Sequence, residues 1–175
     1  MLTYKIAGYE DADAIAALHA LSWQQNYRGV FSDNFLDNEV VVERQAVWKG
    51  RLKNQVENQL VFIVSDGDIL VGFVCAYFDN DTTYGTLIDN LHVNSDYSGQ
   101  GIGEELIRKV IHEMVNSDVV QSMYLWVLAQ NSRAIKFYER AGGKAIETIN
   151  DFDIGDREIT KTRYHWSNLE TFEKN

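Results

Sequence analysis

The sequence has 175 residues, and 16 lysines and arginines against 26 aspartates and glutamates give a formal net charge of −10. This acidic balance argues against general binding to nucleic acids or anionic lipids, and 45% hydrophobic with 24% charged residues is typical of a soluble globular protein. The single cysteine, Cys75, excludes an intramolecular disulfide, and we find no metal-binding motif, signal peptide or membrane-spanning run. We therefore expect one domain over residues 1–175, located in the cytoplasm.

The N-terminal part of the chain predicts a short strand followed by two helices. Residues 3–7 alternate weakly, and Asp11 stands where an N-cap would precede a helix over residues 12–25. The polar residues 26–34 predict a loop, and a second helix is expected over residues 38–54. The first helix has a mostly apolar face, formed by Ala14, Ile15, Leu18, Leu21 and Trp23. The second carries the apolar residues Val41, Val42, Ala46, Val47 and Leu52.

The middle of the chain changes to a β pattern. Residues 60–64 are an apolar run, residues 66–68 are an Asp-Gly-Asp turn signal, and residues 69–78 are a second β-rich run. The chain turns again at residues 80–81 and continues as a strand over residues 83–93. These segments predict an antiparallel meander of three strands.

The C-terminal part alternates between strand and helix signals. Residues 123–129 are apolar on both faces, as in a buried strand. Asn131 predicts the N-cap of a short helix that ends at Arg140, and two strands follow over residues 144–148 and 158–165. The complete order, β-α-α-β-β-β-α-β-α-β-β, predicts an α/β or α+β domain with one mixed sheet.

A glycine-rich turn lies between the third strand of the meander and an amphipathic helix over residues 103–116. Gly99, Gly101 and Gly103 occupy alternate positions there, which leaves bare backbone at a helix N-terminus. Free N–H groups and the positive end of the helix dipole can hold a phosphate at such a place. The plainer interpretation is a turn that only needs flexibility. A dinucleotide fingerprint is excluded because Glu104 stands where a further glycine is required.

Two blocks of sequence resemble the GNAT superfamily of N-acetyltransferases, which use acetyl-CoA. The first block runs from residue 89 through the glycine turn to residue 103, and the second covers residues 131–142. Residues 11–19 also resemble the first helix of that family, and residues 22–29 are similar to a subgroup that acts on small amines. The resemblance implies a single GNAT-like domain: a mixed, mostly antiparallel sheet of about seven strands, splayed between the fourth and fifth, with about four helices.

The resemblance also implies a cofactor site and a catalytic acid. Backbone groups at the end of the fourth strand would hold pantetheine, the glycine turn would hold the pyrophosphate, and Tyr138 would protonate the departing thiolate. The implied cofactor-binding residues are Leu91, His92, Val93, Gly99, Gln100, Gly101, Ile102, Gly103, Glu104 and Asn131.

The reaction needs an unprotonated amine, so a proton acceptor is expected. Asp89 lies where some relatives place an acidic residue facing the substrate, and we expect it to act directly or through water. Strand alternation would place Asp89, Leu91 and Val93 on one face and His92 on the other. The alternatives for this role are Glu10, Glu43, a bridging water and His92.

Each of these roles has a structural alternative. Tyr138 would also fit as a packing residue of its helix, and Asn131 as an N-cap alone. Cys75 is expected to be a small core residue. Three aromatic residues are candidates for the amine pocket or for the core: Trp23, Tyr27 and Tyr77.

Two positions depart from the family pattern. Ser98 stands where Arg or Gln is usual, and Gly143 stands where an aromatic residue usually follows the helix. We nevertheless predict an acetyl-CoA-dependent N-acetyltransferase whose acceptor is a primary amine, for example a polyamine or amino compound. A CoA-binding sensor without turnover and a purely structural interaction domain are the competing hypotheses, and an exposed sheet edge would permit a homodimer.

Overall fold

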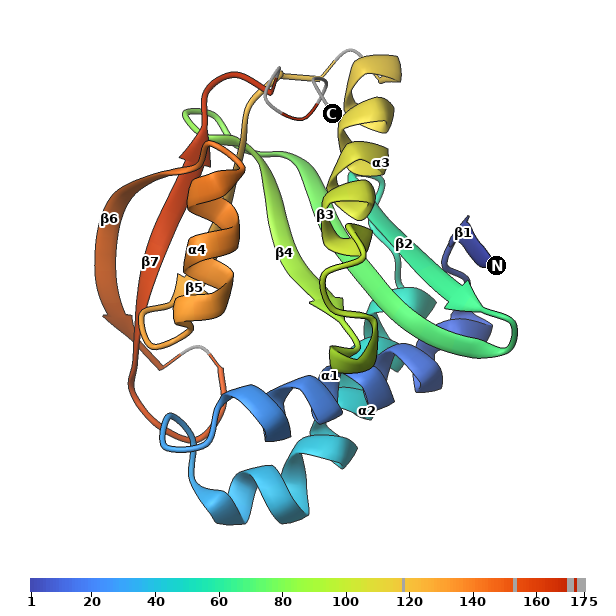
Figure 1. The fold of residues 1–175 in the computed structure, drawn as a ribbon, viewed down its shortest axis with the longest axis vertical. Coiled ribbons are helices and arrows are strands. Elements are labelled where there is room, and N and C mark those ends of the chain that lie inside the picture. Colours follow the sequence, from blue (N-terminus) through green and yellow to red (C-terminus); the bar gives the residue numbers. More distant parts are fainter. Residues whose placement is uncertain (118, 153, 170–171, 173–175) are drawn as a thin grey trace.

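The computed structural model describes residues 1–117, 119–152, 154–169 and 172, and these form one mixed sheet with helices on both faces (Figure 1). The sheet has seven strands in the order β1-β2-β3-β4-β5-β7-β6. Every neighbouring pair is antiparallel except β4 and β5, which are parallel. The strands are β1 (Leu2–Ile6), β2 (Gln59–Asp66), β3 (Ile69–Asp81), β4 (Gly85–Val93), β5 (Met123–Leu128), β6 (Lys144–Asp151) and β7 (Ile159–Trp166).

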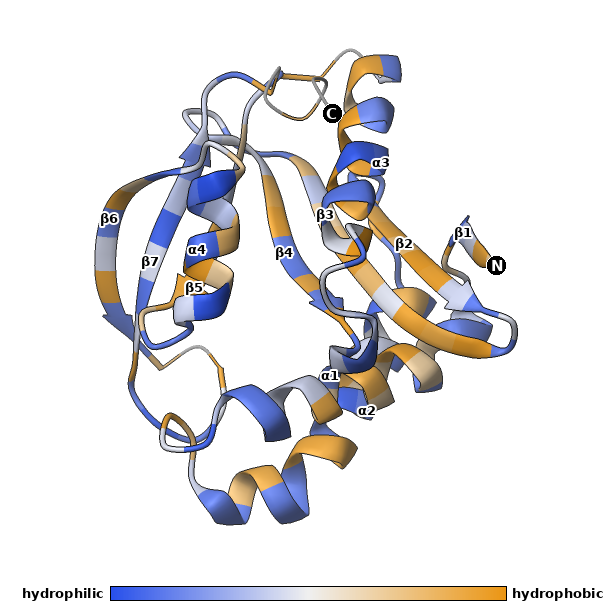
Figure 2. Ribbon diagram, viewed as in Figure 1, coloured by the Kyte–Doolittle hydropathy of each residue, from blue (hydrophilic) through white to orange (hydrophobic). Residues whose placement is uncertain are grey.

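The helices divide between the two faces of the sheet. α3 and α4 cover one face, and their apolar residues share a core cluster with β2–β5 and β7. α1 and α2 pack against β2 and β3 on the other face, around Trp48 and Phe73. Hydropathy colouring shows the apolar positions of α3 turned toward the sheet (Figure 2). The helices are α1 (Ala12–Asn26), α2 (Val40–Lys53), α3 (Ile102–Asn116) and α4 (Ser132–Arg140), with one π-helical turn, Phe35–Glu39, before α2.

The element order, the fold class, the meander and the splay between the fourth and fifth strands are confirmed. The boundaries shift by up to three residues, for example at β3, which continues to Asp81, and at β6, which continues to Asp151. Cys75 is fully buried in β3, as expected, and burial raises the pKa of its thiol to about 12.

The apolar residues expected in α2 form its buried face only in part. Val41 and Val42 are 41% and 68% exposed, while Leu52 is buried together with Arg44 and Trp48. The large indole of Trp48, and no β-branched residue next to it, fills the space against β3. The buried stripe therefore recurs every four residues from Val40 onward.

The N-terminal helix also differs in detail. Ala14 and Leu21 are exposed, whereas His19 is fully buried. Asp11 precedes α1 as predicted, but its carboxylate does not cap that helix. It accepts from the Gly8 N–H at 2.9 Å and pairs with Lys5, so it stabilises the preceding turn instead.

Candidate functional site

A gap between β4 and β5 forms the centre of the site. The two strands pair only at Thr86 with Met123 and at Leu87 with Tyr124, and β5 then continues alongside β7. Beyond these pairs, the β4 residues 88–93 face β5 across an open cavity of about 810 Å³. The backbone on that side of β4 is therefore available to a ligand that binds as an additional strand.

The glycine turn lies at one end of this cavity. Gly99 and Gly101 have φ values of +79° and +75°, which favour glycine, and Gly101 directly precedes α3. The first hydrogen bond of the helix runs from Glu105 N–H to the Gly101 carbonyl at 3.0 Å. The N–H groups of residues 102–104 thus precede the helical ladder and are free to bind an anion. A Cβ built at Gly99 or Gly101 meets no atom within 4 Å, so their outer side is open.

Glu104 places a carboxylate beside this predicted phosphate site. Its side chain accepts from Arg108 Nη2 at 2.6 Å, one turn further along α3. The ion pair partly neutralises the negative charge of the Glu104 carboxylate, which reduces its repulsion of a bound phosphate. The turn and the helix terminus fit a diphosphate, and Arg133 and Arg140 of α4 line the same cavity.

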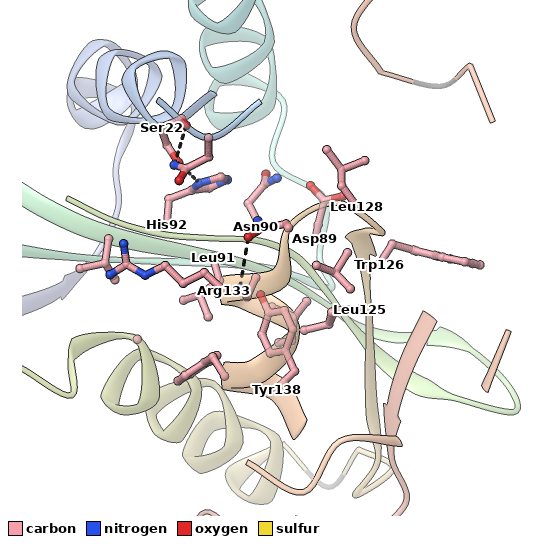
Figure 3. Close-up of a pocket in the computed structure, with 18 of the residues that line it drawn as sticks. Ser22, Asp89, Asn90, Leu91, His92, Leu125, Trp126, Leu128, Arg133 and Tyr138 are labelled. Carbon is pink, nitrogen blue, oxygen red and sulfur yellow. Dashed lines mark hydrogen bonds between the residues drawn. The ribbon is translucent and has the colours of Figure 1, made fainter. Parts of the chain in front are cut away.

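Tyr138 reaches the cavity from the opposite wall. Asn131 caps α4 by accepting from the Ala134 N–H at 3.1 Å, and Tyr138 follows on the buried side of that helix. The tyrosine is only 8% exposed, and its hydroxyl points into the gap between Leu91 and Leu125 (Figure 3). Burial, and to a smaller extent Tyr27, raises the pKa of Tyr138 above its usual value. The phenol is therefore protonated at neutral pH and can donate a proton into the cavity.

The ring of Trp166 fills the space beside Gly143, where the resemblance expects an aromatic side chain. A Cβ at Gly143 would lie 2.5 Å from the Trp166 ring, so only glycine permits this contact. The indole packs edge-on against Tyr138 with ring centroids 5.9 Å apart, and its Nε1 donates to the Ala141 carbonyl at 2.9 Å. An aromatic ring from β7 thus packs against the end of α4, where the resemblance expects one from the chain after α4.

The predicted position of Asp89 is wrong in one respect. A β-bulge between β3 and β4 pairs Cys75 with Asn90 and Ala76 with Ile88, so Asp89 is an extra residue on β4. The bulge turns its carboxylate toward α2, where Arg51 Nη1 donates to Asp89 at 2.6 Å and to Asn90 at 2.8 Å.

Figure 3 shows the consequence of the bulge for the cavity walls. Asp89, Asn90 and His92 lie on the side of α1 and α2, opposite Leu91 and Tyr138. Asp89 therefore does not share a face with Leu91, as strand alternation had predicted, although it still lines the cavity.

His92 belongs to a polar cluster under α1. Its Nδ1 is 2.8 Å from Ser22 Oγ, and its ring lies 4.4 Å from that of His19, which accepts from Trp48 Nε1 at 2.9 Å. Burial, together with nearby Arg44, lowers the pKa of His92 to about 4. The imidazole of His92 is therefore neutral at physiological pH.

The three aromatic candidates for the amine pocket do not lie together in the structure. Trp23 and Tyr27 line the cavity, and burial raises the pKa of Tyr27. Tyr77 is not among the lining residues; it packs beside Cys75 and the cluster under α1 and α2. Gln100 is also absent from the lining.

Sequence reasoning missed several lining residues. Arg44 and Arg51 are seven residues apart on α2 and hence on the same side of the helix, a spacing that was visible in the sequence. Trp126 and Lys161 come from β5 and β7, and only the fold brings them to the cavity. The residues that the structure describes contain no cluster of His, Cys, Asp and Glu suited to a metal ion, and no helix among them is long and apolar enough to cross a membrane.

Comparison with known proteins agrees with this geometry. Residues 15–143 match the model of the acetyltransferase (GNAT) family. The mouse thialysine N-epsilon-acetyltransferase is 33% identical over 82 residues, which are 46% of this chain and 48% of that enzyme. An uncharacterised N-acetyltransferase of Bacillus subtilis is 26% identical over 97% of this chain and 95% of its own. The crystal structure of PaiA N-acetyltransferase from Thermoplasma acidophilum with coenzyme A has a TM-score of 0.74 at 17% identity, over 95% of this chain and 99% of that one.

Proposed function

The chain belongs to the GNAT family of acetyltransferases, and we propose that it acetylates a primary amine of a small molecule by direct attack in a ternary complex. The observation that carries this proposal is the cavity between β4 and β5. It joins the glycine turn, the unpaired side of β4 and the Tyr138 hydroxyl in one continuous space.

Acetyl-CoA is the co-substrate, and when bound it supplies a thioester that is already activated toward amines. We assign the pyrophosphate to the N–H groups of residues 102–104 and the pantetheine arm to the backbone of Leu91, His92 and Val93. The open outer sides of Gly99 and Gly101 support the first assignment, and the missing β5 partner supports the second. Asn131 lines the same cavity beside its capping role.

Two side chains are proposed to move protons. Tyr138 Oη donates to the departing sulfur, because the raised pKa keeps it protonated and its burial limits competing water. The Asp89 carboxylate accepts the proton of the amine, directly or through water. Arg51 donates to its Oδ2, and the second carboxylate oxygen is the one proposed to accept that proton.

Thiol release from acetyl-CoA with a panel of small amines tests the proposal. We expect acetyl-CoA-dependent release that rises with amine concentration and yields the N-acetylated product by mass spectrometry. Calorimetric binding of CoA without release for any amine would instead support a sensor without turnover. Absence of CoA binding would support a structural domain.

A further inference from the structure

Cationic side chains outnumber carboxylates in the lining of the cavity, although the whole chain is acidic. The protein has a formal net charge of −10, yet five cationic side chains and two carboxylates, Asp89 and Glu104, line the cavity. Arg133 and Arg140 belong to α4, on the side of the glycine turn. The remaining cations lie on the side of α1, α2 and β7, and each is paired with a carboxylate: Arg44 with Glu43, Arg51 with Asp89 and Lys161 with Asp151.

Both tryptophans in the lining are already covered by the protein's own cations. The Arg44 guanidinium lies 4.4 Å from the Trp23 ring centroid, and Arg163 and Lys161 lie 4.5 and 5.2 Å from the Trp126 ring. Aromatic faces are the usual binding sites for ammonium groups, and tryptophan is the strongest of them. A second ammonium group on the acceptor would have to displace these contacts to bind either indole.

Arg51 keeps donors available for a ligand. It is 28% exposed, and its Nη1 donates to both Asp89 and Asn90. A guanidinium has five N–H donors, and within the described part of the chain no hydrogen bond uses Nε or Nη2 of Arg51. Arg51 and Asp89 together present a positive and a negative group side by side at the cavity wall.

We propose that the acceptor amine carries an anionic group, a carboxylate or a phosphate, which binds the remaining N–H donors of Arg51. This inference rests on the proposed acetyltransferase function and names its substrate class. The acceptor is an amine that also carries an anionic group, such as an amino acid, and is not a polyamine. A planar guanidinium fork matches both anions, and Asp89 lies beside the same guanidinium, where it can receive the amine.

Matched acceptors test the proposal. Alanine, lysine and phenylalanine are each assayed beside their carboxamide and their decarboxylated amine, and phosphoethanolamine is assayed beside ethanolamine. A hydrogen bond to a charged group contributes about 1.5 to 3 kcal/mol, so we expect the anionic member of a set to have a kcat/KM about 10- to 100-fold higher. The carboxylate and phosphate sets show which anion is preferred. An equal or higher kcat/KM for the members that lack the carboxylate or phosphate, or for spermidine, would overturn the proposal.

Substitutions of Arg51 test whether this residue causes the preference for anionic acceptors. Arg51 also holds the proposed base Asp89, so Arg51→Gln is expected to lower kcat/KM for every acceptor. The ratio of kcat/KM for the anionic acceptor to that for its analogue without the anion should fall a further 10- to 100-fold, about the size of a charged hydrogen bond. Arg51→Lys, which keeps the charge and loses the fork, should give a ratio between those of the wild type and Arg51→Gln. Lys49→Gln makes the same charge change on α2 at an exposed residue paired with Asp13, and should keep the wild-type preference. An equal loss for all acceptors in Arg51→Gln would contradict the assignment.

Binding separates this inference from the proposed function. Calorimetry with the CoA-loaded protein compares each anionic acceptor with its carboxamide, whether or not thiol is released. Selective binding of the anionic member, lost in Arg51→Gln, supports the anion site even if no amine is acetylated. Acetylation without that selectivity would retain the function and refute the acidic acceptor.

Discussion

At the scale of single residues, the site depends on two groups whose chemistry follows from their surroundings. Tyr138 is the proposed proton donor, and burial beside Trp166 and Tyr164 keeps its phenol neutral. Gly101 supplies a left-handed backbone at the helix N-terminus, which side chains rarely adopt. Each of them can be tested with a substitution that removes one property and keeps the rest.

Replacing Tyr138 with phenylalanine removes the proton donor and keeps the ring packing. We expect kcat to fall about 100-fold or more, in the range of general acid catalysis, with acetyl-CoA affinity essentially unchanged. Steady-state kinetics and calorimetry measure the two quantities. Normal turnover with a large loss of affinity would contradict the assigned role.

Replacing Gly101 with valine should abolish CoA binding, because the side chain strains the positive φ and enters the open space assigned to the phosphates. Gly67 is the matched control: it has φ +58°, equally open surroundings and a place in the β2–β3 turn. Gly67→Val should cost similar stability, about 1–2 kcal/mol, and retain CoA binding. Isothermal titration calorimetry with CoA measures the affinity of both variants. Unchanged CoA affinity in Gly101→Val would refute the phosphate assignment.

At the scale of elements, the contact between α4 and β7 compensates for a departure from the family pattern. Gly143 lacks the expected aromatic ring, and the Trp166 indole fills the space and holds the end of α4 through the Ala141 carbonyl. The position of Tyr138 therefore depends on a residue 28 positions further along the chain.

Trp166→Ala should lower the free energy of unfolding by about 3–5 kcal/mol, as expected for a fully buried indole, and should lower kcat because Tyr138 loses its support. Urea unfolding and kinetics measure these effects. Phe152, which is 72% exposed, provides the control, since Phe152→Ala should change stability by less than about 0.5 kcal/mol. A stable, fully active Trp166→Ala variant would contradict this dependence.

At the scale of the whole molecule, one continuous sheet connects every strand, and we propose that residues 1–175 fold as one domain. The splay makes β4 and β5 diverge in the middle of this sheet, so α1 and α2 on one face and α3 and α4 on the other both reach the cavity. The homodimer expected from a sheet edge stays a prediction; β1 and β6 form the two edges.

A histidine pair, the fully buried His19 and the half-buried His92, makes the stability of the molecule depend on pH. The pKa values of His19 and His92 are lowered by burial, which disfavours the charged imidazole, and Arg44 adds to this for both. The unfolded chain then binds more protons between pH 6.5 and about 4, so stability is complete above pH 6.5 and falls with acidification. We expect the urea concentration at the unfolding midpoint to be lower at pH 5 than at pH 7.5, with a loss of about 2 kcal/mol at most from His92 over this interval.

Replacing His92 with asparagine, which does not titrate, checks the origin of this pH dependence. The difference in urea midpoint between pH 7.5 and pH 5 should shrink in the variant relative to the wild type. An unchanged difference would assign the effect to other groups.

Local patterns in the sequence were sufficient for the family, the element order and the glycine turn. Some signals involve only a few neighbouring residues, such as glycines before an amphipathic helix or an asparagine before a shorter one. They can be recognised without knowledge of the fold. The GNAT family, its fold class and its acetyl-CoA co-substrate were identified on this basis and are confirmed.

The tertiary structure decided which side chains meet. A bulge at Asp89 cannot be read from alternation, because the extra residue exists only relative to its partner strand, and it turned the carboxylate toward Arg51. The meeting of Trp166 with Gly143, and of Lys161 with the α2 arginines, joins segments distant in the sequence. The sequence alone thus determined the family and predicted a place for the cofactor, while the side chains proposed to bind the acceptor meet only because the sheet brings them together.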